Sequence, residues 1–206
     1  MSLDSFLKKK FIKNYDFKKK SYLLLKTNNS FNISNAKNFN LLINLELVNN
    51  IRWINKFHEL VNNKLKIDDY YIICSETLEE RRRRIYVKSP FGLKNLIRII
   101  DFIYKRVFPK LPILKKIYFA VTRGHNRIIS KAEILGRLIS CGFEIIEYFE
   151  YNDLFYVISK KKSDPDYNLN PSYSPIFLMK RIGFKGEIIR VFKLRTMYPY
   201  SEYLQN

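Results

Sequence analysis

The chain has 206 residues, of which 47% are hydrophobic and 16% aromatic, so it can bury a core and is not a globally disordered polypeptide. It carries 38 Lys and Arg against 19 Asp and Glu, a formal charge of +19, which points to an anionic partner such as nucleic acid, anionic lipid or a phosphorylated substrate. A background composition rich in Lys, Asn and Ile is the alternative origin of part of this charge.

The sequence indicates neither a metal site nor secretion. Cys74 and Cys141 stand in apolar surroundings without a CxxC or Cys/His spacing, and His58 and His125 have no ligand set nearby, so no metal and no bound cofactor are expected. Residues 1–20 form a basic arm that lacks the apolar stretch of a signal peptide. No run of about 18 uncharged apolar residues occurs, so we expect a cytoplasmic protein that associates peripherally with the inner face of the bacterial cytoplasmic membrane.

The first part of the chain reads as strands that alternate with a helix. Residues 21–27 and the almost continuous apolar run at 39–48 are predicted as strands, the second of the buried parallel kind. Residues 54–65 carry apolar positions at helical spacing, and another strand follows within 67–77. This β-α-β order predicts a parallel sheet in an α/β domain that spans residues 21–162.

Two basic segments follow these elements. The run EERRRRIYVKSPFG at 79–92 is interpreted as a solvated loop, with a specific anion site as the less favoured alternative. Residues 93–121 interleave apolar and aromatic residues with Lys and Arg, and Pro109 and Pro112 break the run. They predict an amphipathic helix with a proline break, lying either in the interface of an anionic membrane or on the sheet. In the membrane alternative, the interface is formed by Arg98, Lys105, Arg106, Lys110, Lys115 and Lys116.

The clearest local prediction is a helix over residues 129–143. Ser130 and Glu133 have the spacing of a capping box, and Gly142 stands where a left-handed C-terminal cap is needed. Residues 144–162 then read as an antiparallel strand pair.

The remainder of the chain is predicted to form a separate unit. The polar segment 163–175 contains three prolines and is interpreted as a linker between domains. Residues 176–206 follow it and contain a predicted β-hairpin that turns at 183–186.

The positions of the glycines bear on cofactor binding. All six lie at residue 92 or later, so no Gly-rich turn follows the early strands and a Rossmann cofactor site is not expected. The stretches FNLLINLELVNNIRWINKF, DYYIICSET, ISKAEILGRLISCGF and EIIEYFEY nevertheless resemble, in order and pattern, the second half of a class I methyltransferase. The resemblance implies a partial Rossmann-like, degenerate methyltransferase-like α/β domain, followed by the short β-hairpin.

The segment PIFLMKRIGFKGEIIRVFKLRTM, residues 175–197, carries a second pattern. It resembles the entry to the catalytic domain of the bacterial sugar transferases, the polyprenyl-phosphate phosphoglycosyl transferases. Ser174 replaces the usual glycine at the start of the three-part motif. The matching positions are Pro175, Ile176 and Phe177, then Arg181, Gly183 and Gly186, then Lys193, Arg195, Thr196 and Met197. Residues from about 39 onward also resemble the N-terminal extension of a long subgroup of this family from Bacteroidetes-like bacteria.

This second resemblance implies a function. Intact members move a sugar-1-phosphate from a nucleotide-sugar to polyprenyl phosphate, with Mg²⁺, in capsule, exopolysaccharide or O-antigen synthesis. The family's acidic dyad lies downstream of the Lys-x-Arg-Thr-Met strand and is not present in this sequence, so no catalytic residue is assigned. The chain is therefore interpreted as the truncated N-terminal portion of a sugar transferase, inactive alone.

The hairpin itself supplies candidate phosphate-binding residues. If its second half is a strand, Lys193 and Arg195 share one face, and such a pair can bind a phosphate. Arg181 and Lys185 complete this candidate set. The alternative is that Lys193 and Arg195 pair with local carboxylates and only hold the fold.

Three other functions remain open at this stage. One is a non-catalytic basic α/β module that docks on an anionic membrane surface or on a partner of the assembly machinery. Another is a relic methyltransferase-like domain that still binds S-adenosylmethionine. Nucleic-acid binding is the weakest, because the charge permits it but no motif places aromatic and basic residues on one surface.

Overall fold

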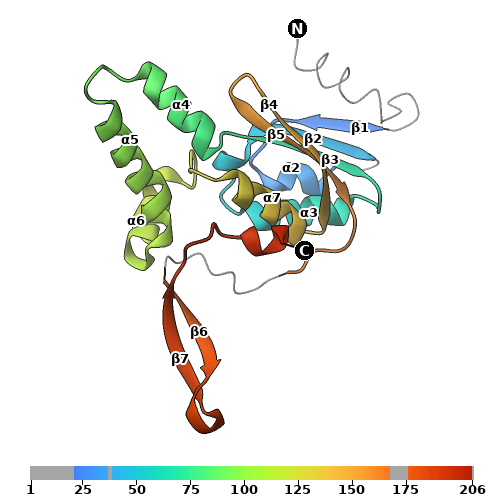
Figure 1. Ribbon diagram of the computed structural model, residues 1–206. Helices are drawn as coiled ribbons and strands as arrows, with labels where there is room; N and C mark the ends of the chain where they lie inside the picture. Colours follow the sequence, from blue (N-terminus) through green and yellow to red (C-terminus); the bar gives the residue numbers. More distant parts are fainter. Residues whose placement is uncertain (1–20, 37–38, 168–175, 206) are drawn as a thin grey trace.

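The computed structural model describes residues 21–36, 39–167 and 176–205, so the predicted basic arm at 1–20 lies outside the described residues. The described part contains a mixed sheet with helices packed on one face, a helical arm and a projecting hairpin (Figure 1). Its strands are β1 (Tyr22–Leu25), β2 (Leu41–Leu47), β3 (Tyr70–Ser75), β4 (Phe143–Tyr151), β5 (Leu154–Lys161), β6 (Ile176–Ile182) and β7 (Ile188–Leu194). Its helices are α2 (Ser30–Ser34), α3 (Ile54–Lys64), α4 (Leu78–Lys88), α5 (Lys94–Phe102), α6 (Pro112–Thr122) and α7 (Lys131–Ser140).

The main sheet has the strand order β1-β2-β3-β5-β4. The first three strands run parallel, whereas β5 pairs antiparallel with β3 and β4 pairs antiparallel with β5. Asn152 and Asp153 connect β4 to β5 with φ of 48° and 58°, the left-handed backbone that a two-residue hairpin turn requires. The sheet confirms the predicted α/β fold class, a partial Rossmann-like domain followed by a short hairpin.

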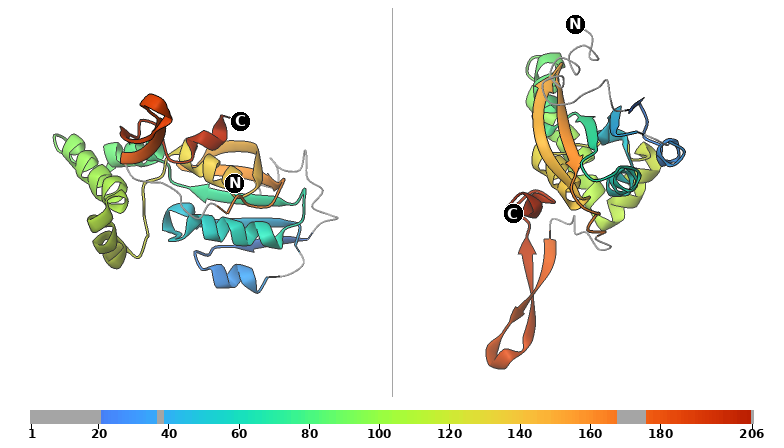
Figure 2. Two further views of the ribbon diagram at one scale, coloured as in Figure 1. Left: turned by 90° about the horizontal axis from the view of Figure 1, so that it is seen from below. Right: turned by 90° about the vertical axis from the view of Figure 1, so that its right-hand side faces the viewer.

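One face of the sheet packs against α2, α3 and α7 (Figure 2). The helices contribute residues one turn apart and the strands contribute alternate residues, as their periods require. Full burial of each such side chain stabilises the fold by about 1.5–3 kcal/mol, which holds the helices to the sheet. The contact is built from Phe57, Val61, Ile134, Leu138, Leu42, Tyr71, Ile73, Phe155 and Val157.

The end of α7 is fixed by a glycine, as predicted. Gly142 has φ of +81°, and a Cβ added there would lie 2.2 Å from the Ser163 carbonyl oxygen. Asn62 of α3 closes the same corner, because its Nδ2 donates to the carbonyl oxygens of Cys141, at 2.8 Å, and Ser163, at 2.9 Å. The residues after β5 are therefore tied to both helices.

The helical arm corrects one prediction. Residues 79–92 are not a solvated loop for most of their length, because α4 occupies Leu78–Lys88. Thr77 and Glu80 form a capping box at its start, Glu79 and Glu80 lie in the first turn, and Lys88 lies in the last, which suits the helix dipole. The capping box and the charges at the two ends therefore stabilise a helix in a segment that lacks an apolar face.

The predicted proline break in the arm is confirmed. After α5, a π-helical stretch (η2, Ile103–Val107) and a 3-10 turn (η3, Phe108–Lys110) lead to Pro112, which begins α6. Helix α5 has no buried residue, so it does not lie on the sheet (Figure 1). None of the helices described is long and apolar enough to cross a membrane.

The hairpin of β6 and β7 forms as predicted, with its turn at η4 (Phe184–Gly186). The chain then returns to the sheet domain, where η5 (Ser201–Leu204) packs on α7. At Gly136 of α7, an added Cβ would lie 2.1 Å from the Tyr200 carbonyl oxygen, so this docking requires glycine. Asn55 of α3 also donates to the Tyr200 hydroxyl at 2.8 Å. The predicted boundary within 163–175 stays a prediction.

Candidate functional site

A basic cleft lies between the sheet domain and the helical arm, next to the carboxyl ends of β2 and β3. Arg52 and Trp53 follow β2 and its 3-10 turn (η1, Val48–Asn50), and Ile129 forms a bridge with Thr77, just after β3. Open α/β sheets bind their ligands at this edge. The cavity measures about 1240 Å³ and is lined chiefly by Arg52, Trp53, Lys56, Glu59, Lys105, Arg106, Lys110, Lys115, Lys116, Phe119, Arg123, Arg127, Glu133 and Arg137.

A buried asparagine holds the floor of this cleft in place. The Asn49 Nδ2 donates to the carbonyl oxygens of Glu76 and Arg127, each at 2.7 Å. Its Oδ1 accepts from the Glu76 amide at 2.8 Å and from the Ser75 hydroxyl at 2.9 Å. One side chain therefore joins the ends of β2 and β3 to the loop before α7. Because all its hydrogen bonds are made, the floor is a rigid support.

A buried carboxylate organises two of the arginines. Glu133 accepts from Arg106 at 3.2 Å and from Arg137 at 2.9 Å, and all three side chains are more than nine-tenths buried. Burial alone would raise the pKa of Glu133, but Arg137 and Arg106 outweigh it and lower that pKa below its usual value. Glu133 therefore stays ionised and fixes both guanidinium groups.

Lys110 lies beside this cluster without a carboxylate of its own. Burial, and then the charge of Arg106, lower the pKa of Lys110 to about 8, with smaller contributions from Arg137 and Arg195, whereas Glu133 opposes the shift. At this point of the cleft the cations outnumber the single carboxylate that faces them. Repulsion between the like charges therefore disfavours the charged form of Lys110.

Most of the remaining cations of the cleft are available to a ligand. Seven of them form no ion pair with any carboxylate in the described part of the chain: Arg52, Lys56, Lys105, Lys110, Lys115, Lys116 and Arg123. Two aromatic rings lie among them. The Arg52 guanidinium lies 5.3 Å from the Trp53 ring centroid and 5.7 Å from that of Phe119. Trp53 is 62% exposed, and the Lys56 ammonium lies 5.6 Å from its ring centroid.

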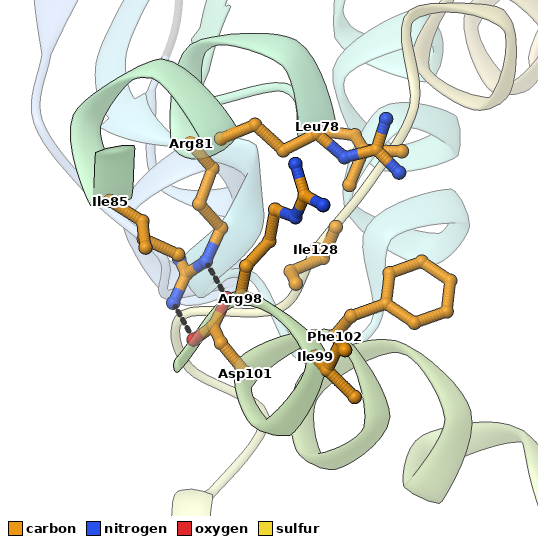
Figure 3. Close-up of a pocket in the computed structure, with 9 residues that line it drawn as sticks. Leu78, Arg81, Ile85, Arg98, Ile99, Asp101, Phe102 and Ile128 are labelled. Atoms are coloured by element: carbon orange, nitrogen blue, oxygen red, sulfur yellow. Dashed lines mark hydrogen bonds and ion pairs between the residues drawn. The ribbon is translucent and has the colours of Figure 1, made fainter. Parts of the chain in front are cut away.

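A smaller cavity of about 300 Å³ lies between α4 and α5 and has a different character. Figure 3 shows the Arg81 guanidinium facing the Asp101 carboxylate, with Nε–Oδ2 and Nη2–Oδ1 distances of 2.7 Å and 2.8 Å. Arg81 also donates to Glu76 at 3.0 Å and to Asn126 at 2.6 Å. This arginine is saturated by protein groups, so it fastens the arm to the end of the sheet rather than serving a ligand.

The structure brings together most of the residues that the sequence assigned to a membrane interface. Lys105, Arg106, Lys110, Lys115 and Lys116 all line the basic cleft. The sixth residue of that set, Arg98, lines the smaller cavity instead. Their assignment to a membrane stays a prediction.

The four candidates on the hairpin are spread out. Arg181 lies in β6 and Lys193 in β7, both exposed, and Lys185 lies at the tip. Arg195 is half-buried just beyond β7 and close enough to Lys110 to affect its pKa. A phosphate-binding role for these four residues stays a prediction.

Sequence reasoning missed several residues of the cleft, among them Arg52, Trp53, Arg127 and Arg137. They come from loops and helices far apart in the chain, so no local motif joins them. One signal was available: Glu133 and Arg137 stand one turn apart within an otherwise apolar helix, which indicates a buried ion pair.

The residues at the end of β1, the first parallel strand of the sheet, do not form a Rossmann-type site for a cofactor such as S-adenosylmethionine. The Thr27 amide donates to Asn44 Oδ1 at 3.1 Å, and Asn44 Nδ2 donates back to the Thr27 carbonyl oxygen at 2.9 Å. These backbone groups are already occupied, and no glycine allows a ligand to approach the turn closely. No group of three or more His, Cys, Asp or Glu suited to a metal ion occurs among the residues described.

Comparison with known proteins gives no match to any family model and none to a curated protein. Among solved structures, the chain is similar to an O-methyltransferase family protein from Burkholderia thailandensis, with 11% identity and a TM-score of 0.39 over 67% of this chain and 35% of that one. It is also similar to a SAM-dependent methyltransferase from Thermotoga maritima, described as a possible histamine N-methyltransferase, with 14% identity and a TM-score of 0.37 over 63% and 61% of the two chains. A third structure, described as PigF with SAH, has 8% identity and a TM-score of 0.41 over 77% and 56%. The chain spans less than two thirds of each of these proteins.

These comparisons overturn the interpretation of the chain as part of a sugar transferase, and with it the assignment to polysaccharide synthesis. None of the three structures is described as a sugar transferase, and two are described as methyltransferases. The relic methyltransferase-like alternative agrees better with them. The motif at 175–197 misled because basic residues around a glycine turn suit many exposed hairpins, and here they lie on one that projects from the domain (Figure 1).

Proposed function

We propose that this chain is a methyltransferase-like binding domain whose basic cleft holds a phosphate-bearing ligand. The imbalance of charge in the cleft carries the proposal. Of the described residues that line it, ten are Lys or Arg and two are Glu, and one of these, Glu133, is already paired with two arginines. A concave surface of one sign raises the local concentration of ions of the opposite sign.

The same charge argues against S-adenosylmethionine as the ligand. That cofactor carries a sulfonium and an ammonium group against one carboxylate, so its net charge is positive. A cleft with ten cations repels it, whereas a diphosphate brings two or more negative charges. Lys110 strengthens this preference, since a nearby phosphate would favour its charged form and relieve the crowding around it.

The aromatic residues narrow the class of ligand. Trp53 and Phe119 lie beside the unpaired cations, and an exposed ring next to a phosphate site is a surface on which a base can stack. A nucleotide would use both features, and a phosphorylated lipid headgroup would use the cations alone.

The fluorescence of Trp53 tests the proposal directly, because Trp53 is the single tryptophan of the chain and lines the cleft. We expect inorganic pyrophosphate to change its emission saturably, and the affinity to fall as salt is added. Adenosine diphosphate should bind more tightly than pyrophosphate if the rings stack on a base, and equally if the phosphates alone are recognised.

Matched charge reversals provide the control. Lys110→Glu, within the cleft, should weaken pyrophosphate binding by about tenfold or more, since a hydrogen bond to a charged group contributes about 1.5–3 kcal/mol. Lys88→Glu makes the same change of charge at an exposed residue of α4 that does not line the cleft, and should leave the affinity nearly unchanged. Equal losses in the two variants would mean that overall charge, and not the cleft, attracts the ligand.

A further inference from the structure

The hairpin of β6 and β7 exposes an unusual amount of apolar surface. All seven residues of β7 are exposed, and an isolated two-stranded hairpin is at best marginally stable in water. The turn end of the hairpin carries three strongly exposed apolar side chains: Ile182 is 83% exposed, Phe184 86% and Ile188 69%. The right view of Figure 2 shows the hairpin extending away from the sheet domain, in agreement with the exposure of these side chains.

The apolar and charged residues are arranged in layers along the hairpin. Ile182 pairs with Ile188 nearest the turn, and Lys180 pairs with Arg190 two residues further back on the same face. Like charges directly opposite each other destabilise a strand pair unless an anion lies between them. The next layer, Leu178 paired with Phe192, is apolar again.

We propose that the hairpin tip inserts into the interface of an anionic membrane. Ile182, Phe184 and Ile188 would enter the boundary between headgroups and acyl chains, and Lys180 and Arg190 would bind lipid phosphates. The two layers are about 7 Å apart along the strands. This separation suits a group that enters an interface by about 5–10 Å. The inference rests on the hairpin and is independent of the basic cleft.

Charge complementarity selects this partner over others. Residues 176–195 contain six Lys and Arg and a single acidic residue, Glu187, so two hairpins of two copies would repel each other. A nucleic acid would pair with the cations but would leave the apolar tip in water. An anionic bilayer satisfies both layers at once.

Vesicle flotation with the full chain tests the proposal. We expect binding to vesicles of phosphatidylcholine that contain phosphatidylglycerol, and little binding to phosphatidylcholine alone. The double variant Ile182→Ser, Phe184→Ser should lose about tenfold or more of the binding, because it removes the inserted apolar surface. Lys180→Glu with Arg190→Glu should lose the preference for phosphatidylglycerol.

Two controls keep the result interpretable. Ile113→Ser alters a residue of α6, outside the hairpin, that is 79% exposed, and this variant should bind vesicles as the unmodified chain does. Each variant should also unfold in urea with the same midpoint as the unmodified chain, which shows that it is folded whether or not the cleft binds phosphate. Undiminished vesicle binding by the tip variant would overturn the proposal, as would equal binding to soluble polyglutamate, since an acidic protein would then be the better partner.

A tryptophan at the tip gives a second measurement. In a Trp53→Phe background, Phe184→Trp should show emission shifted to shorter wavelength when anionic vesicles are added, because the ring leaves water. No shift in the presence of bound vesicles would exclude insertion of the tip.

Discussion

His58 makes the stability of this domain sensitive to acid. Its side chain is fully buried in α3, and its Nδ1 lies 3.2 Å from the Tyr71 hydroxyl. Burial, and then the charge of Arg137, lower the pKa of His58 from 6.5 to about 3. The folded state therefore holds the imidazole neutral under conditions in which the unfolded chain takes up a proton.

The sign and size of the effect follow from this difference. Because the pKa in the folded state is the lower one, the stabilisation is complete above pH 6.5 and is lost as the pH falls from 6.5 toward 3. At about pH 5 the loss amounts to roughly 2 kcal/mol, since each unit of pKa difference is worth about 1.4 kcal/mol once the unfolded chain is protonated. That loss is a large fraction of the stability of a typical domain.

Urea denaturation near pH 7.5 and near pH 5 measures this loss. His58→Asn keeps a hydrogen-bonding atom near Tyr71 but cannot titrate, so it should lose about 2 kcal/mol less than the unmodified chain between the two conditions. His125→Asn replaces the exposed histidine and should retain the full loss. If His58→Asn and the unmodified chain lost equal stability, the reasoning from burial would be refuted.

Three further predictions concern packing and charge. Gly136→Ala should detach the C-terminal turn from α7, because its Cβ would lie 2.1 Å from the Tyr200 carbonyl oxygen, and proteolysis of residues 198–205 should become faster. Burial raises the pKa of Cys74 and of Cys141 to about 12, so neither thiol should react with a thiol reagent until urea unfolds the chain; fast reaction in native buffer would contradict this. Glu133→Gln leaves Arg106 and Arg137 without their carboxylate and should lower the free energy of unfolding, measured by urea titration, by about 3–5 kcal/mol. In the same titration, added pyrophosphate should stabilise this variant more than it stabilises the unmodified chain.

The sheet domain could be predicted from the sequence because its elements follow simple rules. The apolar strand runs, the helical spacing at 54–65 and the glycine at 142 each match a structural feature within a few residues. Helix α4 was missed because its buried residues include one apolar side chain, Leu78, so the sequence shows no apolar helical face. The helix is stabilised instead by the capping box of Thr77 and Glu80. Local sequence patterns therefore predict those helices and strands whose buried apolar residues recur at helical or strand spacing.

The capping box at Ser130 was only half correct. Ser130 accepts from the Glu133 amide at 3.3 Å, as predicted, but the Glu133 carboxylate turns to Arg106 and Arg137. Arg106 comes from the arm, 27 residues earlier in the chain, and a pattern within one helix cannot reveal such a partner. The basic cleft as a whole was missed for the same reason, since the loop after β2, the arm and α7 each contribute part of it.

Calorimetric titration of the full chain with pyrophosphate, and separately with S-adenosylmethionine, tests the central claim most directly. The charge of the cleft predicts a saturable heat with pyrophosphate that weakens in Lys110→Glu, and no heat with S-adenosylmethionine. Saturable binding of S-adenosylmethionine, with none of pyrophosphate, would contradict the assignment of the cleft to a phosphate-bearing ligand.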